Sequence, residues 1–375
     1  MSTMLTGKPQ LNREVNRRII LDRIRREGEV SRADLAKITE IRPPTISAVM
    51  RDLVDEGLVE ERGAGATNGG RAPRLFAIRG SIPRALGIEI NESKILAALC
   101  DLHGEACQQV NVDFEPCSPE QTIKTLLNLR DDLLSAAGIT WSTVLGVGIA
   151  MPGLIRGEEG LVRLSKPFDW HEVSFRAMCE QAWNRKTYVV NDSLAGGMAA
   201  HFLGGAGGVR NLVYLNVRYL NASHGVLGLG CGIVIDGEPF HGEFGAAGEI
   251  TTPVAHPVMQ LGSSQSTQAV SQFVDLVTKG DRNATSALEI SSDEVARLAI
   301  HIINFLEPGM LILGIDEPRL VQPVLTRIRS RVREAGLAET TDHTQVVAAD
   351  LGKFGLVRGA VVPALQDVFR LPRWS

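Results

Sequence analysis

Small polar side chains and one arginine share one face of the segment 43–56. The apolar side chains of this segment follow the helical spacing i, i+3, i+4, i+7 and i+8: Ile46, Val49, Met50, Leu53 and Val54. The opposite face then carries Thr45, Ser47, Ala48 and Arg51. Such a face can enter the major groove of DNA, whereas a face of glutamates could not. The segment therefore predicts a DNA-reading helix.

Two further helices are expected to hold this segment in place. Apolar residues recur at helical spacing among arginines from about residue 12 to 26, and Gly28 ends that helix. Ser31 is a good N-cap for a helix over 32–38, with Asp34 at the capping-box position. Prolines at 43 and 44 suit the first turn of the third helix, because a missing N–H costs little there.

A hairpin with a glycine-rich tip is expected after the third helix. Its strands are predicted over 58–62 and 71–78, and the tip between them reads GAGATNGG. Three helices and a hairpin make a winged helix-turn-helix, in which a bare tip can approach DNA closely. A small helical protein-interaction domain is the alternative. The candidate DNA-binding residues, two of them at the base of the wing, are Arg42, Thr45, Ser47, Arg51, Arg71 and Arg74.

Charge is distributed unevenly along the chain. Residues 1–78 carry 14 basic and 11 acidic side chains, and 12 of the basic ones are arginine. The rest carries 25 basic and 32 acidic side chains, although the net charge of the whole chain is only −4. Only the N-terminal part is therefore expected to meet a polyanion.

Length and composition limit the class of protein and the number of domains. The 375 residues are 44% hydrophobic and 22% charged, which suits a folded protein of about two to three domains. No apolar run approaches about 18 residues and no secretion signal is visible, so we expect a cytoplasmic protein without a membrane partner. The 5 cysteines have no C-x-x-C spacing, which argues against a disulfide framework and a zinc knuckle.

From residue 85 onward, short apolar runs alternate with glycine turns and helical segments. A three-stranded meander is expected over 85–112, a helix over 119–137 and a strand over 144–153. Later strands are expected over 187–192, 211–217, 226–237, 310–314 and 345–350, and later helices over 193–203, about 291–306 and 355–369. This α/β pattern is compatible with an actin-like fold of two lobes around a cleft.

Five motifs occur in order along this part: GIEINESKI (87–95), GVGIAMPG (146–153), VVNDSLAGGMAA (189–200), GLGCGIVIDG (228–237) and GAAGEI (245–250). Together they resemble the ROK family of sugar kinases and sugar-responsive repressors, and NGGRAPRLF (68–76) is similar to the wing of its repressor branch. The resemblance implies a winged helix-turn-helix followed by a two-lobed actin-like (ribonuclease H-like) ATPase fold. We expect domains over 1–80 and 81–375, the second with lobes over about 81–200 plus the C-terminal helix, and over 201–354.

The chain departs from the family's kinases at the nucleotide. Family kinases hold ATP phosphates with D-x-G-G-T, which here reads EINES (89–93), so Asn91 and Glu92 replace two glycines. Side chains then stand where backbone N–H groups would approach a polyphosphate. Residues 226–232 alter the second phosphate loop, and 314–317 alter the glycine pair at the adenosine. ATP is therefore not expected as a cofactor.

The ligands of the family's zinc site are also replaced. The family takes a histidine from G-E-I-G-H and three cysteines from a C-x-C-G-x-x-G-C run. Here Thr251 and Thr252 follow the G-E-I, and residues 260–271 contain no cysteine. No metal is therefore expected. His256 lies nearby, but a lone histidine is more often a surface or hydrogen-bonded residue than a ligand.

The sugar side of the family site survives in part. Asn191 and Asp192 match the family's N-D pair, and Glu249 matches the glutamate of G-E-I, so the resemblance implies that all three bind sugar hydroxyls. The alternative for the pair is a strand-ending turn in which Asp192 caps the next helix. Two other family contacts fall on Ser271 and Thr252, which leaves an unusual effector and weak or lost binding open.

These expectations define a ROK-type transcriptional regulator. We expect it to act as a repressor and to have no kinase activity. Its partners would be operator DNA and a small carbohydrate effector. It would act as a homodimer or homotetramer, because a single small head reads few base pairs. Two alternatives stay open: a sugar kinase with a DNA-binding head, supported by Asp192, and a constitutive DNA-binding protein whose body only oligomerises.

Overall fold

The computed structural model describes residues 9–64, 72–80, 82–157, 159–206, 208–220, 225–263 and 267–369. We call the described residues up to 80 the head and the remainder the body. The head consists of α1 (Pro9–Glu27), α2 (Arg32–Thr39), α3 (Pro43–Asp55) and the strands β1 (Val30–Ser31), β2 (Val59–Ala64) and β3 (Arg74–Ile78). The strands pair antiparallel in the order β1-β3-β2. The predicted winged helix-turn-helix is confirmed.

Local signals place the helices of the head as expected. The Ser31 hydroxyl accepts a hydrogen bond from the Asp34 backbone N–H at 3.1 Å and donates to the Asp34 carboxylate at 2.7 Å. Helix α3 buries Ile46, Val49, Met50 and Leu53. Val54 was expected on the same face, but its side chain is 37% exposed. It lies about 80° around the helix from Ile46, at the margin of the apolar stripe.

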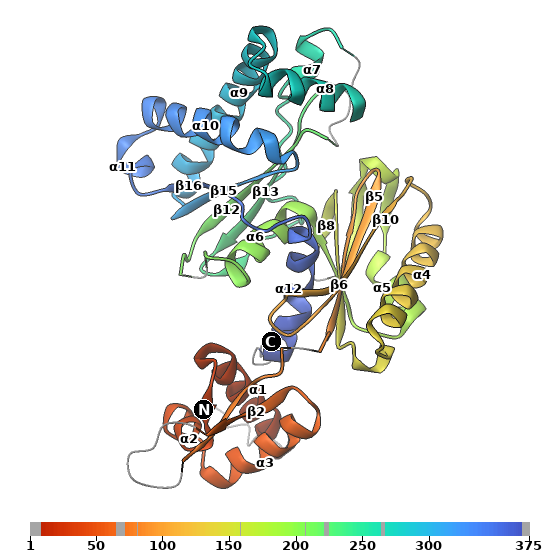
Figure 1. Ribbon diagram of the computed structural model, residues 1–375, viewed down its shortest axis with the longest axis vertical. Helices are drawn as coiled ribbons and strands as arrows, with labels where there is room; N and C mark the ends of the chain where they lie inside the picture. The colour runs from red at the N-terminus through yellow and green to blue at the C-terminus, as the bar shows by residue number, and fades with distance from the viewer. Residues whose placement is uncertain are drawn as a thin grey trace, which may run out of the picture.

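The first sheet of the body has five strands in the order β11-β7-β4-β5-β6. Their bounds are β4 (Ala85–Ile90), β5 (Lys94–Cys100), β6 (Ala106–Asp113), β7 (Gly146–Met151) and β11 (Thr187–Asn191). Strands β4, β5 and β6 form the antiparallel meander, and β7 and β11 extend it in parallel. Helices α4 (Pro119–Ala137) and α5 (Phe175–Trp183) cover one face, and α12 (Gly355–Phe369) covers the other (Figure 1).

The second sheet repeats this topology in the order β14-β13-β12-β15-β16. Its strands are β12 (Leu212–Arg218), β13 (Gly228–Ile235), β14 (Glu238–Pro239), β15 (Met310–Ile315) and β16 (Gln345–Ala348). An antiparallel meander is again extended by two parallel strands. The helices around it are α7 (Pro257–Gln260), α8 (Thr267–Thr278), α9 (Arg282–Leu306), α10 (Val321–Ala335) and α11 (Ala338–Thr341). The repeated topology is that of the expected two-lobed body.

Helix α9 begins earlier than the predicted residue 291. The Asp281 carboxylate caps it by accepting hydrogen bonds from the backbone N–H groups of Asn283 (3.0 Å) and Ala284 (2.9 Å). Its first turns bury Ala284, Ala287 and Leu288. A cap and a buried face together extend the helix to Arg282.

Helices α6 (Asp192–Phe202) and α12 lie between the two sheets, and α12 continues to the head, where it ends beside α1 (Figure 1). The packing is close enough to require glycine. A Cβ on Gly148 of β7 would lie 1.9 Å from the Ala360 carbonyl oxygen, and one on Gly359 would lie 1.9 Å from the Ala195 carbonyl oxygen. Backbone therefore packs directly on backbone at this crossing.

A third, smaller sheet has no counterpart in the sequence prediction. It pairs β8 (Leu154–Arg156), β9 (Leu161–Ser165) and β10 (Trp170–Val173) antiparallel beside the first sheet. Short 3-10 turns occur at Trp141–Thr143, Lys166–Phe168 and Pro318–Leu320. Within the described ranges, no helix combines the length and the apolar character needed to cross a membrane.

Candidate functional site

The exposed face of α3 carries the side chains that the sequence selected for DNA reading. Thr45 and Ser47 are half-buried, whereas Arg42 and Arg51 are exposed. Neither arginine has an ion pair with another described residue. Their guanidinium groups are therefore available to phosphate or to a guanine edge.

The carboxylates of α3 are held by arginines of α1. Arg13 binds Asp52 at 2.5 Å, and Arg17 donates to the Glu56 carboxylate at 2.7 Å and 2.5 Å. These ion pairs fix α1 against α3 and offset the negative charge of the recognition helix. Arg13 and Arg17 are thus occupied inside the head.

The base of the wing is only partly described. Arg74, at the start of β3, is exposed and donates to the Glu61 carboxylate at 3.1 Å across the hairpin. Arg71 and most of the glycine-rich tip lie outside the described residues. A phosphate that reaches Arg74 would meet a guanidinium already paired with a carboxylate.

In the body, Asn191 and Asp192 lie where β11 passes into α6. The Asn191 side-chain oxygen accepts hydrogen bonds from the N–H groups of Ser193 (2.9 Å) and Leu194 (3.2 Å), and its amide donates to the Gly153 carbonyl at 3.1 Å. The helix cap is therefore Asn191; the alternative in which Asp192 is the cap is wrong. Asp192 is the first residue of α6, and one of its oxygens accepts from the Ser193 N–H at 2.7 Å.

The second oxygen of Asp192 faces an arginine that the sequence analysis did not select. Arg218, the last residue of β12, lies 3.3 Å from the Asp192 carboxylate and 3.6 Å from the Glu92 carboxylate, and its side chain is only 19% exposed. Glu92 stands in the turn after β4, at the position of the family's first phosphate loop. The sequence did hold one signal that could have identified Arg218: it is a charged residue at the end of an apolar strand, just before an apparent insertion.

Further carboxylates surround this arginine, and we call Glu89, Glu92, Asp192, Glu249 and Asp316 the carboxylate cluster. Burial, and then the charge of Asp192, raises the pKa of Glu89 to about 7. The pKa of Glu249 is raised for the same two reasons. Burial alone would lower the pKa of Arg218, but the neighbouring carboxylates, Asp192 first, outweigh it and raise that pKa. The structure therefore places Asp192 and Glu249 in one electrostatic environment.

Asp316 fixes the chain that leaves Arg218. Its carboxylate accepts hydrogen bonds from the backbone N–H groups of Tyr219 (2.7 Å) and Leu220 (3.0 Å). Asp316 follows β15, in the segment where the family usually has its adenosine glycines. Side chains of this chain thus meet at the positions that the family uses for phosphates and for adenosine.

Glu249 also lines a small apolar cavity of about 310 Å³, next to β13 and α9. Gly248 precedes it with φ 88°, and a Cβ there would lie 1.9 Å from the Cys231 carbonyl oxygen. This close approach sets the position of Glu249 beside the second sheet.

His256 is a fully buried hydrogen-bonding residue, with 0% of its surface exposed. Its Nδ1 accepts a hydrogen bond from the Val258 N–H at 3.2 Å, so Nε2 carries the proton and donates to the Tyr219 carbonyl at 2.9 Å. Burial lowers its pKa, which favours this neutral form. His256 thus ties α7 to the end of β12. Among the described residues, no group of three or more His, Cys, Asp or Glu side chains is suited to hold a metal ion.

Family profiles match the head and the body separately. The profile of the ROK family matches residues 85–260 and 257–367, and a profile described as winged helix-turn-helix DNA-binding matches residues 13–60. The chain belongs to the ROK family.

Several relatives align with nearly the whole of this chain. The xylose repressor of Caldicellulosiruptor bescii is 24% identical over 98% of this chain and 100% of its own. The DNA-binding transcriptional dual regulator NagC of Escherichia coli K12 is 19% identical over 95% of each chain. A crystal structure of a ROK family transcriptional regulator, a homologue of the E. coli Mlc protein, has a TM-score of 0.77 at 21% identity, covering 96% of this chain and 98% of that one. The expected fold is confirmed.

Proposed function

We propose that the protein is a ROK family transcriptional repressor. It binds operator DNA through its head and responds to a carbohydrate. The observation that carries the proposal is the recognition face of α3 together with its N-cap residue Arg42. Arg42 and Arg51 of this surface are exposed and have no ion pairs among the described residues. Thr45 and Ser47 complete that face, and Arg71 and Arg74 of the wing would contact phosphates. The relatives named as repressors support the same role.

The effector would bind beside Asp192. Asn191, Asp192 and Glu249 would accept hydrogen bonds from sugar hydroxyls. The five carboxylates of the cluster face Arg218 and, near Glu249, Lys166, so the surroundings are negative and favour an uncharged sugar over a sugar phosphate.

We further propose that the protein has no kinase activity and needs no cofactor. Arg218 pairs with Asp192, the residue that would act as general base, and with Glu92 at the phosphate loop. A nucleotide would have to displace this pairing and approach an anionic side chain. Turnover of ATP with a hexose, aminosugar or pentose, lost in Asp192→Asn, would instead establish the kinase alternative.

The operator-binding role is tested on the recognition helix. DNA selected from a random pool is titrated with the full chain, and the affinity is read by fluorescence anisotropy. Arg51→Ala should weaken specific binding about tenfold, because one side-chain contact to a base edge is lost. Arg333→Ala, an exposed arginine of α10 in the body, is the matched control. Equal discrimination between selected and random DNA in Arg51→Ala would remove this residue from the interface.

The proposed assembly is a homodimer or homotetramer. Two heads would double the contacts with a symmetric operator. A sugar that changes how the two lobes of each body pack would change the spacing between the two heads. Sedimentation of the free and DNA-bound protein gives the stoichiometry. A monomer in both states contradicts the assembly.

A further inference from the structure

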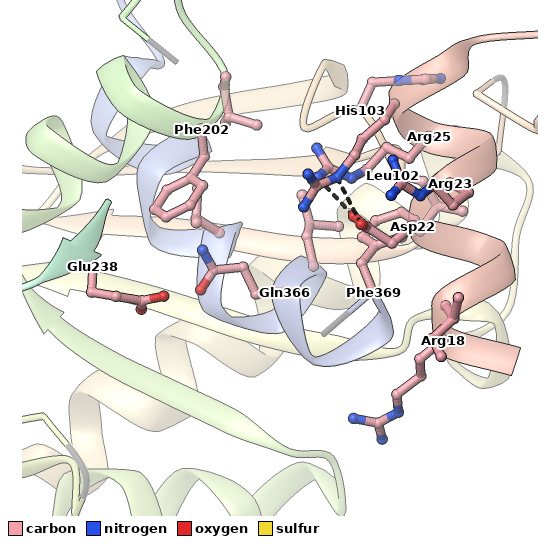
Figure 2. Close-up of a pocket in the computed structure, with 15 residues that line it drawn as sticks. Arg18, Asp22, Arg23, Arg25, Leu102, His103, Phe202, Glu238, Gln366 and Phe369 are labelled. Atoms are coloured by element: carbon pink, nitrogen blue, oxygen red, sulfur yellow. Dashed lines mark hydrogen bonds and ion pairs between the residues drawn. The ribbon is translucent and has the colours of Figure 1, made fainter. Parts of the chain in front are cut away.

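A cavity of about 670 Å³ lies where the head meets the body (Figure 2). Helix α1 of the head lines one side, and Phe202, Glu238 and Gln366 of the body lie on the other. These residues come from the end of α6, from β14 and from α12. The volume is in the range of small-molecule sites. A molecule bound here would contact the head, both central helices and the edge of the second sheet.

The α1 side of the cavity is rich in positive charge. Four arginines of α1 line it against two carboxylates, Asp22 and Glu238. Asp22 is shared by Arg25 at 3.0 Å and Arg26 at 2.7 Å. Arg23 is half-buried and has no hydrogen bond or ion pair with any described residue. A half-buried cation without a partner favours an anion beside it.

The body side of the cavity offers apolar surface. Phe202, Leu203 and Leu365 line the cavity, and the Arg25 guanidinium lies 5.3 Å from the centre of the Phe369 ring.

We propose that this cavity binds an organic oxyanion that carries a compact apolar group. The oxyanion pairs with Arg23, while the apolar group packs on Phe202 and Leu203. The site is separate from the carboxylate cluster, and its ligand differs in charge from the uncharged sugar proposed there. Because the walls belong to α1 and α12, the bound ligand stabilises one placement of the head on the body.

The test uses the full chain and three probes: phenyl phosphate, inorganic phosphate and the neutral benzyl alcohol. In calorimetry, phenyl phosphate should bind saturably at one site, and both other probes should bind more weakly. Arg23→Gln should weaken phenyl phosphate binding about tenfold or more, because a charge-assisted hydrogen bond is lost. Arg333→Gln, which removes one exposed arginine of the body, should leave the affinity unchanged.

Hydrogen exchange supplies a second measurement that does not depend on the variants. Phenyl phosphate should slow exchange in α1 and α12. Protection elsewhere, equal affinity for inorganic phosphate, or unchanged affinity in Arg23→Gln overturns the proposal. None of these readouts depends on operator specificity or on sugar binding.

Discussion

At the scale of single residues, one arginine of the body lies among carboxylates that come from different elements. Arg218 lies 3.3 Å from Asp192 and 3.6 Å from Glu92, side chains that come from α6 and from the β4–β5 turn. Arg218 itself ends β12, so the ion pairs join the second sheet to α6 and to a turn of the first sheet. Removing one partner of such a group would leave the other charges uncompensated in a poorly solvated place.

Glu89 gives a pH prediction at this scale. Its pKa is about 7 in the folded protein against an ordinary 4.5, mainly because burial disfavours the charged form. The protonated side chain therefore contributes stability that is fully present below about pH 4.5 and is lost as the pH rises through 7. The Gln side chain of Glu89→Gln is neutral at every pH. Between pH 4.5 and 8, the free energy of unfolding of this variant should therefore fall by about 1 to 3 kcal/mol less than that of the parent.

The measurement is urea unfolding of both proteins across that pH range. Glu115→Gln is the matched control, since Glu115 is exposed and has no ion pair among the described residues. Parallel pH dependences for the parent and Glu89→Gln would show that Glu89 is ionised in the folded protein.

The sequence predicted some members of this site and missed others for a physical reason. Asn191, Asp192 and Glu249 stand in motifs, so a resemblance could select them. Arg218 acts through contacts with residues far away in the chain, and no local pattern encodes such contacts. Glu89 and Glu92 were noticed only as departures from a phosphate loop, because their electrostatic role depends on Arg218 and on burial.

At the scale of elements, the crossing of α12 over β7 depends on the absence of side chains. A Cβ on Gly148 would lie 1.9 Å from the Ala360 carbonyl oxygen, which is backbone and cannot rotate away. Gly148→Ala must therefore separate the helix from the sheet, at a cost of about 3 kcal/mol or more. We expect a marked fall in the melting temperature.

Gly205→Ala is the matched control, because a Cβ at that position meets nothing within 4 Å. It should leave the melting temperature nearly unchanged. A Gly148→Ala variant as stable as the parent would mean that α12 can move away from β7 at little cost.

Elements with strong periodicity or caps were predictable. The helix over 119–137 and the meander of the first sheet match the sequence expectation closely, since their apolar spacing and turns are local signals. The strands β8, β9 and β10 were missed because each is short and their pairing is decided by tertiary contacts. The start of α9 was missed because its first turns bury alanines, which give a weak apolar signal.

At the scale of the whole molecule, two sheets of the same topology enclose α6 and α12, and α12 extends to the head (Figure 1). Asp192 begins α6, so a ligand there touches the element between the lobes. The path from a sugar to the DNA-binding helix would therefore run through α6, α12 and α1. Such a path regulates DNA binding only if the sugar has different affinities for two arrangements of these parts.

This arrangement predicts the response of the thermal midpoint to sugars. An uncharged pentose, hexose or aminosugar that binds only the folded protein should raise the midpoint by several degrees at about 100 times its Kd. Its phosphate ester should not, because the carboxylate cluster repels a dianion. The rise should vanish in Asp192→Ala and persist in Asp342→Ala, where an exposed carboxylate without an ion pair among the described residues is removed. A panel without any rise, together with intact DNA binding, would contradict sugar sensing and favour a constitutive DNA-binding protein, because a degenerate body would then serve only to bring two heads together.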